Sequence, residues 1–291
     1  MSALPQDVRE TVEKLSGISI KDHANPYDAI DWPEEMDKAQ WYTSPRFISL
    51  KGTKAYEALG EERQKILSFY EAVNFYSLNI HGEKPLCKGL AHRLYRPEHE
   101  EISPYLHHFL AEENNHMIYF ATFCKKYADK LYPDKHIIFP RDYAEGEEDF
   151  LFFVHTLIFE EIVQFYNLRM SKDEMLEPTA RRINYLHHRD EVRHLVFGRK
   201  ITRHLFNTHA PNWSPEVLQG VRDSLQAFLL MTWKEYYNPD VYRDADLENP
   251  YELQEMAWQH PACVEHRKEV SGVLTKYLLG NKILEEEPAL V

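Results

Sequence analysis

Two Glu-x-x-His strings lie in apolar, helix-patterned parts of the chain, Glu113-Asn-Asn-His116 and Glu191-Val-Arg-His194. A helix turns by about 100° per residue, so positions i and i+3 share a face and the two side chains of each string can bind one ion. Four-helix bundles that hold two metal ions use two such pairs, and each of the other two helices adds one Glu. The strings therefore predict a helical bundle in which two further carboxylates complete a two-metal site.

Two other helical segments offer candidates for these carboxylates. Glu160 and Glu161 lie inside the apolar run Phe-Val-His-Thr-Leu-Ile-Phe-Glu-Glu-Ile-Val-Gln-Phe. Burial of an unpaired carboxylate there would be costly, and a bound cation would remove that cost. In the first helical segment Glu83 is the best candidate, because it lies in the middle of an apolar pattern, and Glu71 is the competing choice.

A further potential ligand precedes the second string. His187, Glu191 and His194 are at positions i, i+4 and i+7, which fall within an arc of about 60° on one helix face. Carboxylates mixed with imidazoles, without thiolates, favour iron or manganese over structural zinc. The three cysteines are far apart in the sequence and predict neither a disulfide framework nor a Cys-based zinc site.

Composition predicts an all-α fold. The chain of 291 residues has only 10 Gly and long stretches without Gly or Pro. We expect one domain, with an N-terminal arm over about 1–55, a bundle core over about 60–205 and extra helices over about 214–291. A long connection over 129–146 allows the crossover found in ferritin-like bundles. The helices are expected over about 61–95, 103–126, 147–170, 178–204, 214–237 and 264–279.

Two of these helices carry local signals. Gly82 and Pro85 interrupt the first one, where we expect a kink or local unwinding because Pro cannot donate the helical hydrogen bond. Ser103 is the expected N-cap of the second, with Pro104 at its first helical position.

Charge and hydropathy exclude several functions. The formal net charge of −13 and the lack of a Lys/Arg run argue against nucleic acid or an anionic membrane as a partner. No segment approaches the roughly 18 apolar residues of a membrane span, and residues 1–10 lack a basic region that leads into an apolar one. We expect a soluble, cytoplasmic protein and a homodimer, whose C-terminal helices pack on the bundle or on the second subunit.

Several longer strings resemble one family, the AurF-type di-iron N-oxygenases, named for para-aminobenzoate N-oxygenase. The resemblance covers roughly residues 40–205. It rests on His187-His-Arg-Asp-Glu191-Val-Arg-His194, Glu160-Glu161-Ile-Val, the connection Met-Ser-Lys-Asp-Glu, Glu113-Asn-Asn-His116, Leu50-Lys-Gly-Thr53, Leu59-Gly-Glu-Glu-Arg-Gln64 and Tyr70-Glu-Ala72.

The resemblance implies a ferritin-like bundle whose site has four Glu and three His, one His more than usual. The extra one is His187, and the family's spacing favours Glu160 over Glu161. Pro85 beside the first ligand departs from the family pattern, as do Asp190 and Asn114-Asn115 beside the others. The implied ligands are Glu83, Glu113, His116, Glu160, His187, Glu191 and His194.

The same resemblance implies an activity. Two iron ions, with manganese as a substitute, would activate O₂ and oxygenate a small (aryl)amine to a hydroxylamine, nitroso or nitro product in the biosynthesis of a specialised metabolite. An external electron donor would reduce the iron again. Phe75, Tyr166 and neighbouring aromatic residues are expected to shape an apolar pocket or the core. The alternatives are a di-iron hydroxylase or desaturase that acts on carbon, and a non-catalytic iron-handling protein.

Overall fold

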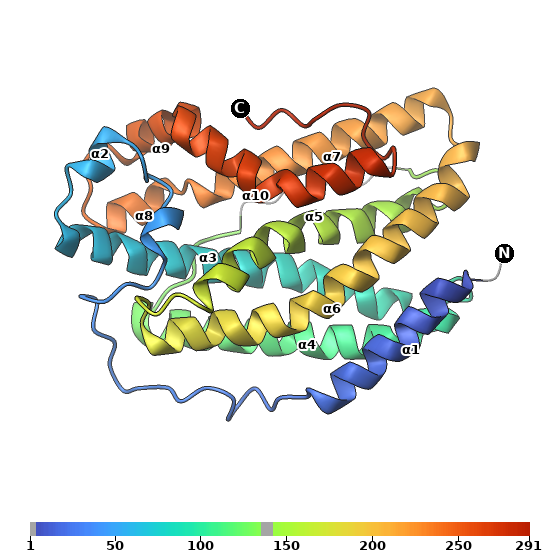
Figure 1. The fold of residues 1–291 in the computed structure, drawn as a ribbon, viewed down its shortest axis with the longest axis horizontal. Helices are drawn as coiled ribbons and strands as arrows, with labels where there is room; N and C mark the ends of the chain where they lie inside the picture. The colour runs from blue at the N-terminus through green and yellow to red at the C-terminus, as the bar shows by residue number, and fades with distance from the viewer. Residues whose placement is uncertain (1–3, 135–141) are drawn as a thin grey trace.

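The computed structural model describes residues 4–134 and 142–291, so part of the connection expected over 129–146 lies outside them (Figure 1). Within these ranges the fold is all-α, as predicted, and its one β-type contact is an isolated bridge between Trp41 and Leu176. The α-helices are α1 (Gln6–Lys21), α2 (Lys54–Glu57), α3 (Glu61–Arg93), α4 (Ser103–Phe123), α5 (Glu147–Met170), α6 (Pro178–His209), α7 (Pro215–Tyr236), α8 (Pro239–Asp244), α9 (Pro250–Gln259) and α10 (Pro261–Gly280).

Four long helices form the core bundle. The most extensive packing joins α3 to α4 and α5 to α6, and α3 also contacts α5 while α4 contacts α6. Each helix turns an apolar face inward, with fully buried residues such as Phe69, Phe109, Leu157 and Phe197. The inner faces of these four helices therefore enclose the space in which the candidate ligands lie.

A helix in the expected N-terminal arm covers one face of the bundle. α1 packs on α4 and α6 (Figure 1). Its buried residues Val8, Val12, Leu15 and Ser19 recur every three or four positions, the period of one helix face. This helix was not predicted, although the spacing of its apolar residues is visible in the sequence.

The C-terminal helices cover the opposite side. α7 and α10 both pack on α5, while α8 packs on α3 and on α9 (Figure 1). α10 buries the guanidinium of Arg267, which donates hydrogen bonds to the carbonyl of Leu290 (2.9 Å) and the hydroxyl of Tyr237 (2.9 Å). The C-terminal segment is thereby attached to the bundle of its own chain.

Side-chain caps explain several helix ends. The hydroxyl of Ser214 accepts a hydrogen bond from the Val217 amide at the start of α7, and the carboxylate of Glu177 accepts one from the Ala180 amide at the start of α6. The expectation for Ser103 was wrong. A short 3₁₀ turn precedes α4, so Ser103 is already helical and its hydroxyl donates to the carbonyl of His99 instead.

Of the kink or local unwinding expected in the first bundle helix, the local unwinding does not occur. α3 stays helical through Pro85. Packing compensates for the missing hydrogen bond, because Leu86 and Leu90 are buried and Gly82 lies against the ring of Phe159 on α5. A Cβ atom at position 82 would lie 2.5 Å from Phe159 Cζ, so glycine is required for this approach.

The expected helix over 103–126 changes type before its end. α4 ends at Phe123, and the chain continues as a π-helical turn over Cys124–Ala128. Asp129 then leaves it with a φ of 51°. The helix expected over 147–170, by contrast, has the same bounds as α5.

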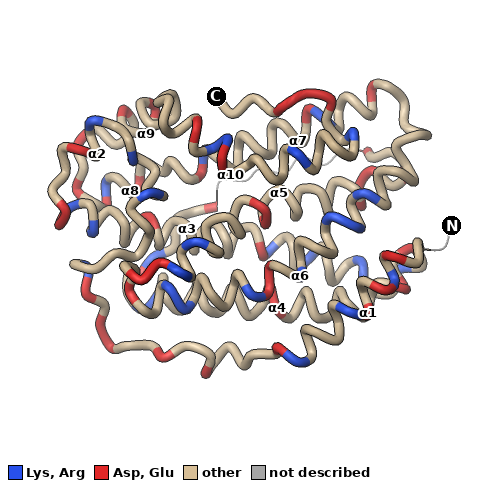
Figure 2. The backbone as a smooth tube through the Cα atoms, in the orientation of Figure 1, with Lys and Arg blue, Asp and Glu red and all other residues tan. Residues whose placement is uncertain are grey.

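Surface charge is mixed. Acidic and basic residues are interspersed along the helices (Figure 2). No helix in the described ranges is long and apolar enough to cross a membrane.

Candidate metal centre

All seven ligand candidates lie together inside the bundle. Each is at most 2% exposed. α4 and α5 begin at the same end of the bundle, where His99 lies 3.0 Å from Asp149, and α3 and α6 run in the opposite direction (Figure 1). One stretch of each long helix meets the same interior point. α3 supplies one candidate, α4 two, α5 one and α6 three: Glu83, Glu113, His116, Glu160, His187, Glu191 and His194.

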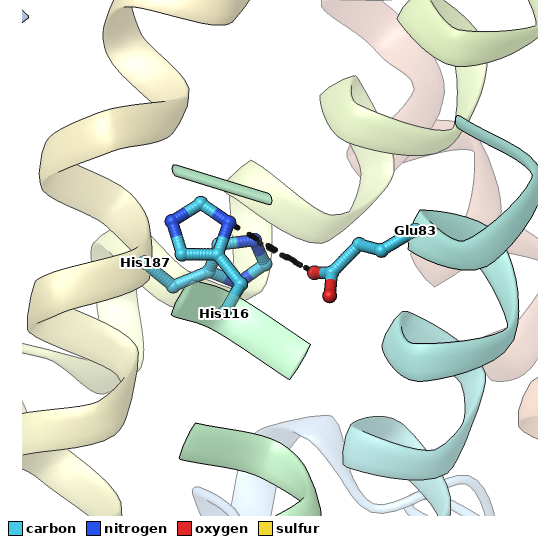
Figure 3. Close-up of side chains that lie close together, drawn as sticks. All are labelled: Glu83, His116 and His187. Atoms are coloured by element: carbon cyan, nitrogen blue, oxygen red, sulfur yellow. Dashed lines mark ion pairs between the residues drawn. The ribbon is translucent and has the colours of Figure 1, made fainter. Parts of the chain in front are cut away.

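These residues form three overlapping groups, each able to hold one ion. In each group the potential ligand atoms lie within 4.8 Å of one another. Figure 3 shows the first, in which Glu83 faces His116 and His187 from across the bundle. The groups are Glu83 with His116 and His187, Glu113 with His116 and Glu191, and Glu113 with Glu160 and His194.

Shared members merge these groups into one cluster. Glu113 belongs to two groups and His116 to two. His187 Nε2 lies 2.8 Å from Glu191 Oε1, and His194 Nδ1 lies 2.8 Å from Glu113 Oε1. His116 and His187 belong to one group and His194 to another, and the carboxylate of Glu113 lies between them. Such an arrangement fits two ions that share a carboxylate better than it fits a single ion.

Many ligand atoms of the cluster are buried without a hydrogen-bond partner among the described residues. Such atoms are costly in a protein interior, and a cluster of them is explained by a bound ion. Oxygen and nitrogen donors of this kind suit iron or manganese. The atoms are both carboxylate oxygens of Glu83 and of Glu160, Glu191 Oε2 and His116 Nδ1.

The outer nitrogens of two histidines are held by carboxylates. His116 Nε2 lies 3.3 Å from Asp190 Oδ2, and His194 Nε2 lies 2.8 Å from Glu112 Oε2. Arg193 joins these carboxylates, since its Nη2 donates to Glu112 (2.7 Å) and to Asp190 (2.6 Å). A carboxylate behind a histidine fixes the tautomer in which the inner nitrogen is free to bind metal.

The third histidine has an amide behind it. His187 Nδ1 lies 2.8 Å from Asn167 Nδ2, and both residues are buried. His187 therefore presents Nε2 to the cluster, which is the opposite ring nitrogen from the one that His116 and His194 present.

Burial raises the pKa of two cluster carboxyls. The pKa of Glu83 is well above its usual value because the group is desolvated and lies near the charge of Glu113. The pKa of Glu160 is raised by desolvation and by Glu191. In the absence of metal, these two groups hold protons, which a bound cation would displace.

The pKa values of two histidines are raised as well, by neighbouring charges and against the effect of burial. Burial alone would lower the pKa of His116, but Glu113 and Asp190 raise it to about 9. Burial also opposes protonation of His194, yet Glu113 and Glu191 raise its pKa well above the usual value. The cluster without metal thus balances its carboxylates with imidazolium charge, which is the role that metal ions would take over.

The competing carboxylates point elsewhere. Glu161 is paired with Arg199, whose Nε lies 2.6 Å from Glu161 Oε1. Glu71 accepts a hydrogen bond from the Ser49 amide (3.1 Å), on a different side of α3. Neither belongs to a metal-capable group, so geometry favours Glu160 and Glu83 over them.

Sequence reasoning overlooked Glu112, Arg193 and the position of Asn167 behind His187. A signal for the carboxylates was present. Glu112 precedes Glu113 as Asp190 precedes Glu191, so each string reads acid-Glu-x-x-His. Aromatic rings also contact two of the histidines. Phe109 is stacked on His194 with ring centroids 4.0 Å apart, and Phe120 is edge-on to His187 with centroids 5.0 Å apart.

The family comparison agrees with this cluster. Residues 5–278 match the family described as P-aminobenzoate N-oxygenase AurF. The chain belongs to this family. The resemblance found in the sequence over roughly 40–205 is therefore confirmed, and the AurF family match extends it through α1 and α7–α10. No curated protein sequence matches the chain.

Solved structures similar to this AurF-family chain include several of an R2-like ligand-binding oxidase. A Tyr-to-Phe mutant with an aerobically reconstituted Mn/Fe cofactor has a TM-score of 0.51 and 18% identity, and the match covers 91% of this chain and 93% of that one. The form with an aerobically reconstituted metal cofactor after photoconversion has a TM-score of 0.50 and 16% identity, covering 90% and 92%. These likenesses confirm the ferritin-like bundle fold.

Proposed function

We propose that this chain is a dimetal oxygenase that transfers an oxygen atom from O₂ to the nitrogen of a small amine, with an arylamine as the favoured substrate. Two iron ions would be held by Glu83, Glu113, His116, Glu160, His187, Glu191 and His194, and manganese is the expected substitute. The observation that carries the proposal is the convergence of buried, unpartnered carboxylate and imidazole atoms in a chain of the AurF family.

The chemistry divides between metal and protein. Bound iron would supply electrons to O₂ and transfer one oxygen atom. The chain's own residues orient and shield that centre. Asp190 and Glu112 hold the histidines from behind, while Phe109 and Phe120 keep water from the ring faces. An external electron donor would be needed to return the centre to its reduced state.

Metal loading and product analysis test this proposal together. Metal-free protein is loaded with ferrous iron without oxygen, the bound iron is measured, and the protein is mixed with O₂ and an arylamine. We expect about two irons per chain and a hydroxylamine or a more oxidised nitrogen product by mass spectrometry. Iron binding with oxidation at carbon only would contradict N-oxygenation, and the absence of stoichiometric iron would contradict the dimetal site.

The adjacent glutamates of α5 provide a matched control. Glu160→Gln removes a charge that we assign to the metal, whereas Glu161→Gln removes one that is paired with Arg199. We expect the first variant to lose iron and the second to keep it. His187→Ala should likewise lower iron content while the helical circular dichroism is unchanged. Equal iron content in the unmodified protein and in these three variants would exclude Glu160 and His187 as metal ligands.

A further inference from the structure

A second site lies away from the metal candidates. A cavity of about 150 Å³ opens between the segment around Phe47, α3, α5, α7 and α10. Its wall carries the aromatic rings of Phe47, Tyr166, Trp233 and Tyr236, and none of the seven ligand candidates lines it. From Glu71 in this wall to Glu83 in the cluster, α3 advances about 18 Å at about 1.5 Å per residue, so a molecule held here is not at the metal centre.

The wall also contains a buried carboxylate. Glu71 is 7% exposed and lines both the cavity and a small hollow of about 20 Å³ beside it. Its only hydrogen-bond donors among the described residues are the amide and the hydroxyl of Ser49. That hydroxyl also lies 2.8 Å from the Tyr242 hydroxyl. Two donors from one serine leave the rest of the carboxylate facing the cavity.

No cation of the described residues pairs with Glu71. Two positively charged side chains line the same cavity, but each has another partner. Arg46 Nη2 lies 3.6 Å from a carboxylate oxygen of Glu269, and Lys51 Nζ lies 3.1 Å from one of Glu57. The carboxylate is therefore buried without the compensating charge that a protein interior normally requires.

The nearby histidine does not supply that charge. Burial lowers the pKa of His266 to about 4, so its ring is neutral at physiological pH. Its Nε2 lies 2.9 Å from the Tyr166 hydroxyl, a partner that a neutral ring accommodates. The wall thus presents one carboxyl group among aromatic rings and a neutral imidazole, and a cation beside it would stabilise the carboxylate form.

We propose that this cavity binds a small primary ammonium that carries one aromatic ring or an apolar group of similar size, with the ammonium against Glu71. A cation gains from the faces of aromatic rings and from a desolvated carboxylate. A cavity of about 150 Å³ is large enough for one benzene-sized group. The site goes beyond the proposed oxygenation and does not depend on it, because it needs no metal.

Calorimetry on the metal-free full-length protein tests the site with two probes of equal size. Benzylamine is a cation at neutral pH, and benzyl alcohol is its neutral counterpart. We expect benzylamine to bind and benzyl alcohol to bind about 10- to 100-fold more weakly, because hydrogen bonds to charged groups are the stronger ones. Equal binding of both probes, or no binding of benzylamine, would overturn the proposal.

Variants locate the bound probe. Glu71→Gln keeps the shape of the side chain and its hydrogen bonds to Ser49, and we expect it to lose about 10- to 100-fold in benzylamine affinity. Glu62→Gln, at an exposed position of the same helix, should bind as the unmodified protein does. Glu160→Gln should also retain binding, which separates this site from the metal centre. Unchanged affinity in a folded Glu71→Gln protein would rule out the assignment.

Discussion

His187 Nδ1 lies 2.8 Å from the side-chain amide nitrogen of Asn167. If His187 binds metal through Nε2, its Nδ1 carries a proton and needs an acceptor. The amide oxygen of Asn167 is buried without a partner among the described residues. The oxygen and nitrogen of an amide occupy nearly equivalent positions. Rotation of the Asn167 amide by half a turn therefore places its oxygen beside His187 Nδ1, so that this oxygen accepts the hydrogen bond from the ring.

Replacing Asn167 should therefore weaken metal binding. Asn167→Leu removes the acceptor behind His187, and we expect a loss of about 10- to 100-fold in iron affinity, measured by competition with a chelator. Asn167→Asp keeps an acceptor oxygen and should retain loading. If the leucine variant holds iron as tightly as the unmodified protein, the amide does not support a metal ligand.

Arg193 should be important for stability. It is 4% exposed and bridges the carboxylates of Glu112 and Asp190. Arg193→Met leaves Glu112 without its arginine, whereas Asp190 keeps Arg189, whose Nε lies 2.9 Å away. We expect a loss of about 1.5–3 kcal/mol in the free energy of unfolding, from urea denaturation of metal-free protein. Arg203→Met, on the same helix, breaks only a half-exposed pair with Asp7 and should cost at most about 1 kcal/mol. Similar losses in both variants would contradict this reading.

Glu71 should make stability depend on pH. Burial raises its pKa to about 7, so between about pH 4.5 and 7 the native state holds a proton that the unfolded chain has lost. The free energy of unfolding then falls as pH rises through this window, by about 3 kcal/mol from this group. Urea denaturation across pH should show that Glu71→Gln removes this decline. A constant difference between the two proteins from pH 4 to 8 would exclude it.

Asp149 should make the free energy of unfolding rise with pH, the opposite of the effect of Glu71. Burial alone would raise its pKa, but His99 (3.0 Å) and Arg93 (2.8 Å) hold it at about 2. The resulting stability is present above the unfolded value near 4 and is lost as pH falls through 2. We expect Asp149→Asn to lower the free energy of unfolding by about 2 kcal/mol at neutral pH, in denaturation curves that converge near pH 2. A loss that is the same at both pH values would point to packing instead.

The sequence predicted the helices whose ends have local signals. α5 has the expected bounds because an acidic first turn follows Gly146 and the apolar run ends at Met170. α7 begins after Ser214, whose side chain caps it, close to the start expected for that helix. α3 was harder, since the effect of Pro85 depends on the neighbouring helix that packs there, which a single sequence does not display.

The same distinction holds for the site. Glu and His three positions apart mark a shared helix face whatever surrounds them, so both strings were visible from spacing alone. The bridge made by Arg193 depends on how α4 lies against α6, and the surroundings of Glu71 depend on a segment that crosses α3 from the N-terminal arm. Spacing along one helix does not encode contacts of this kind.

The absence of a side chain at Gly82 has a consequence for the ions that the protein can accept. Gly82 and Phe159 come directly before Glu83 and Glu160, the candidate ligands of α3 and α5. The phenyl ring lies against the backbone at Gly82, so the approach of α3 to α5 beside these two carboxylates is limited by the ring alone. We therefore expect a larger residue at position 82 to move the two candidate ligands apart and to change which ions the centre accepts, at a position that offers no ligand atom of its own.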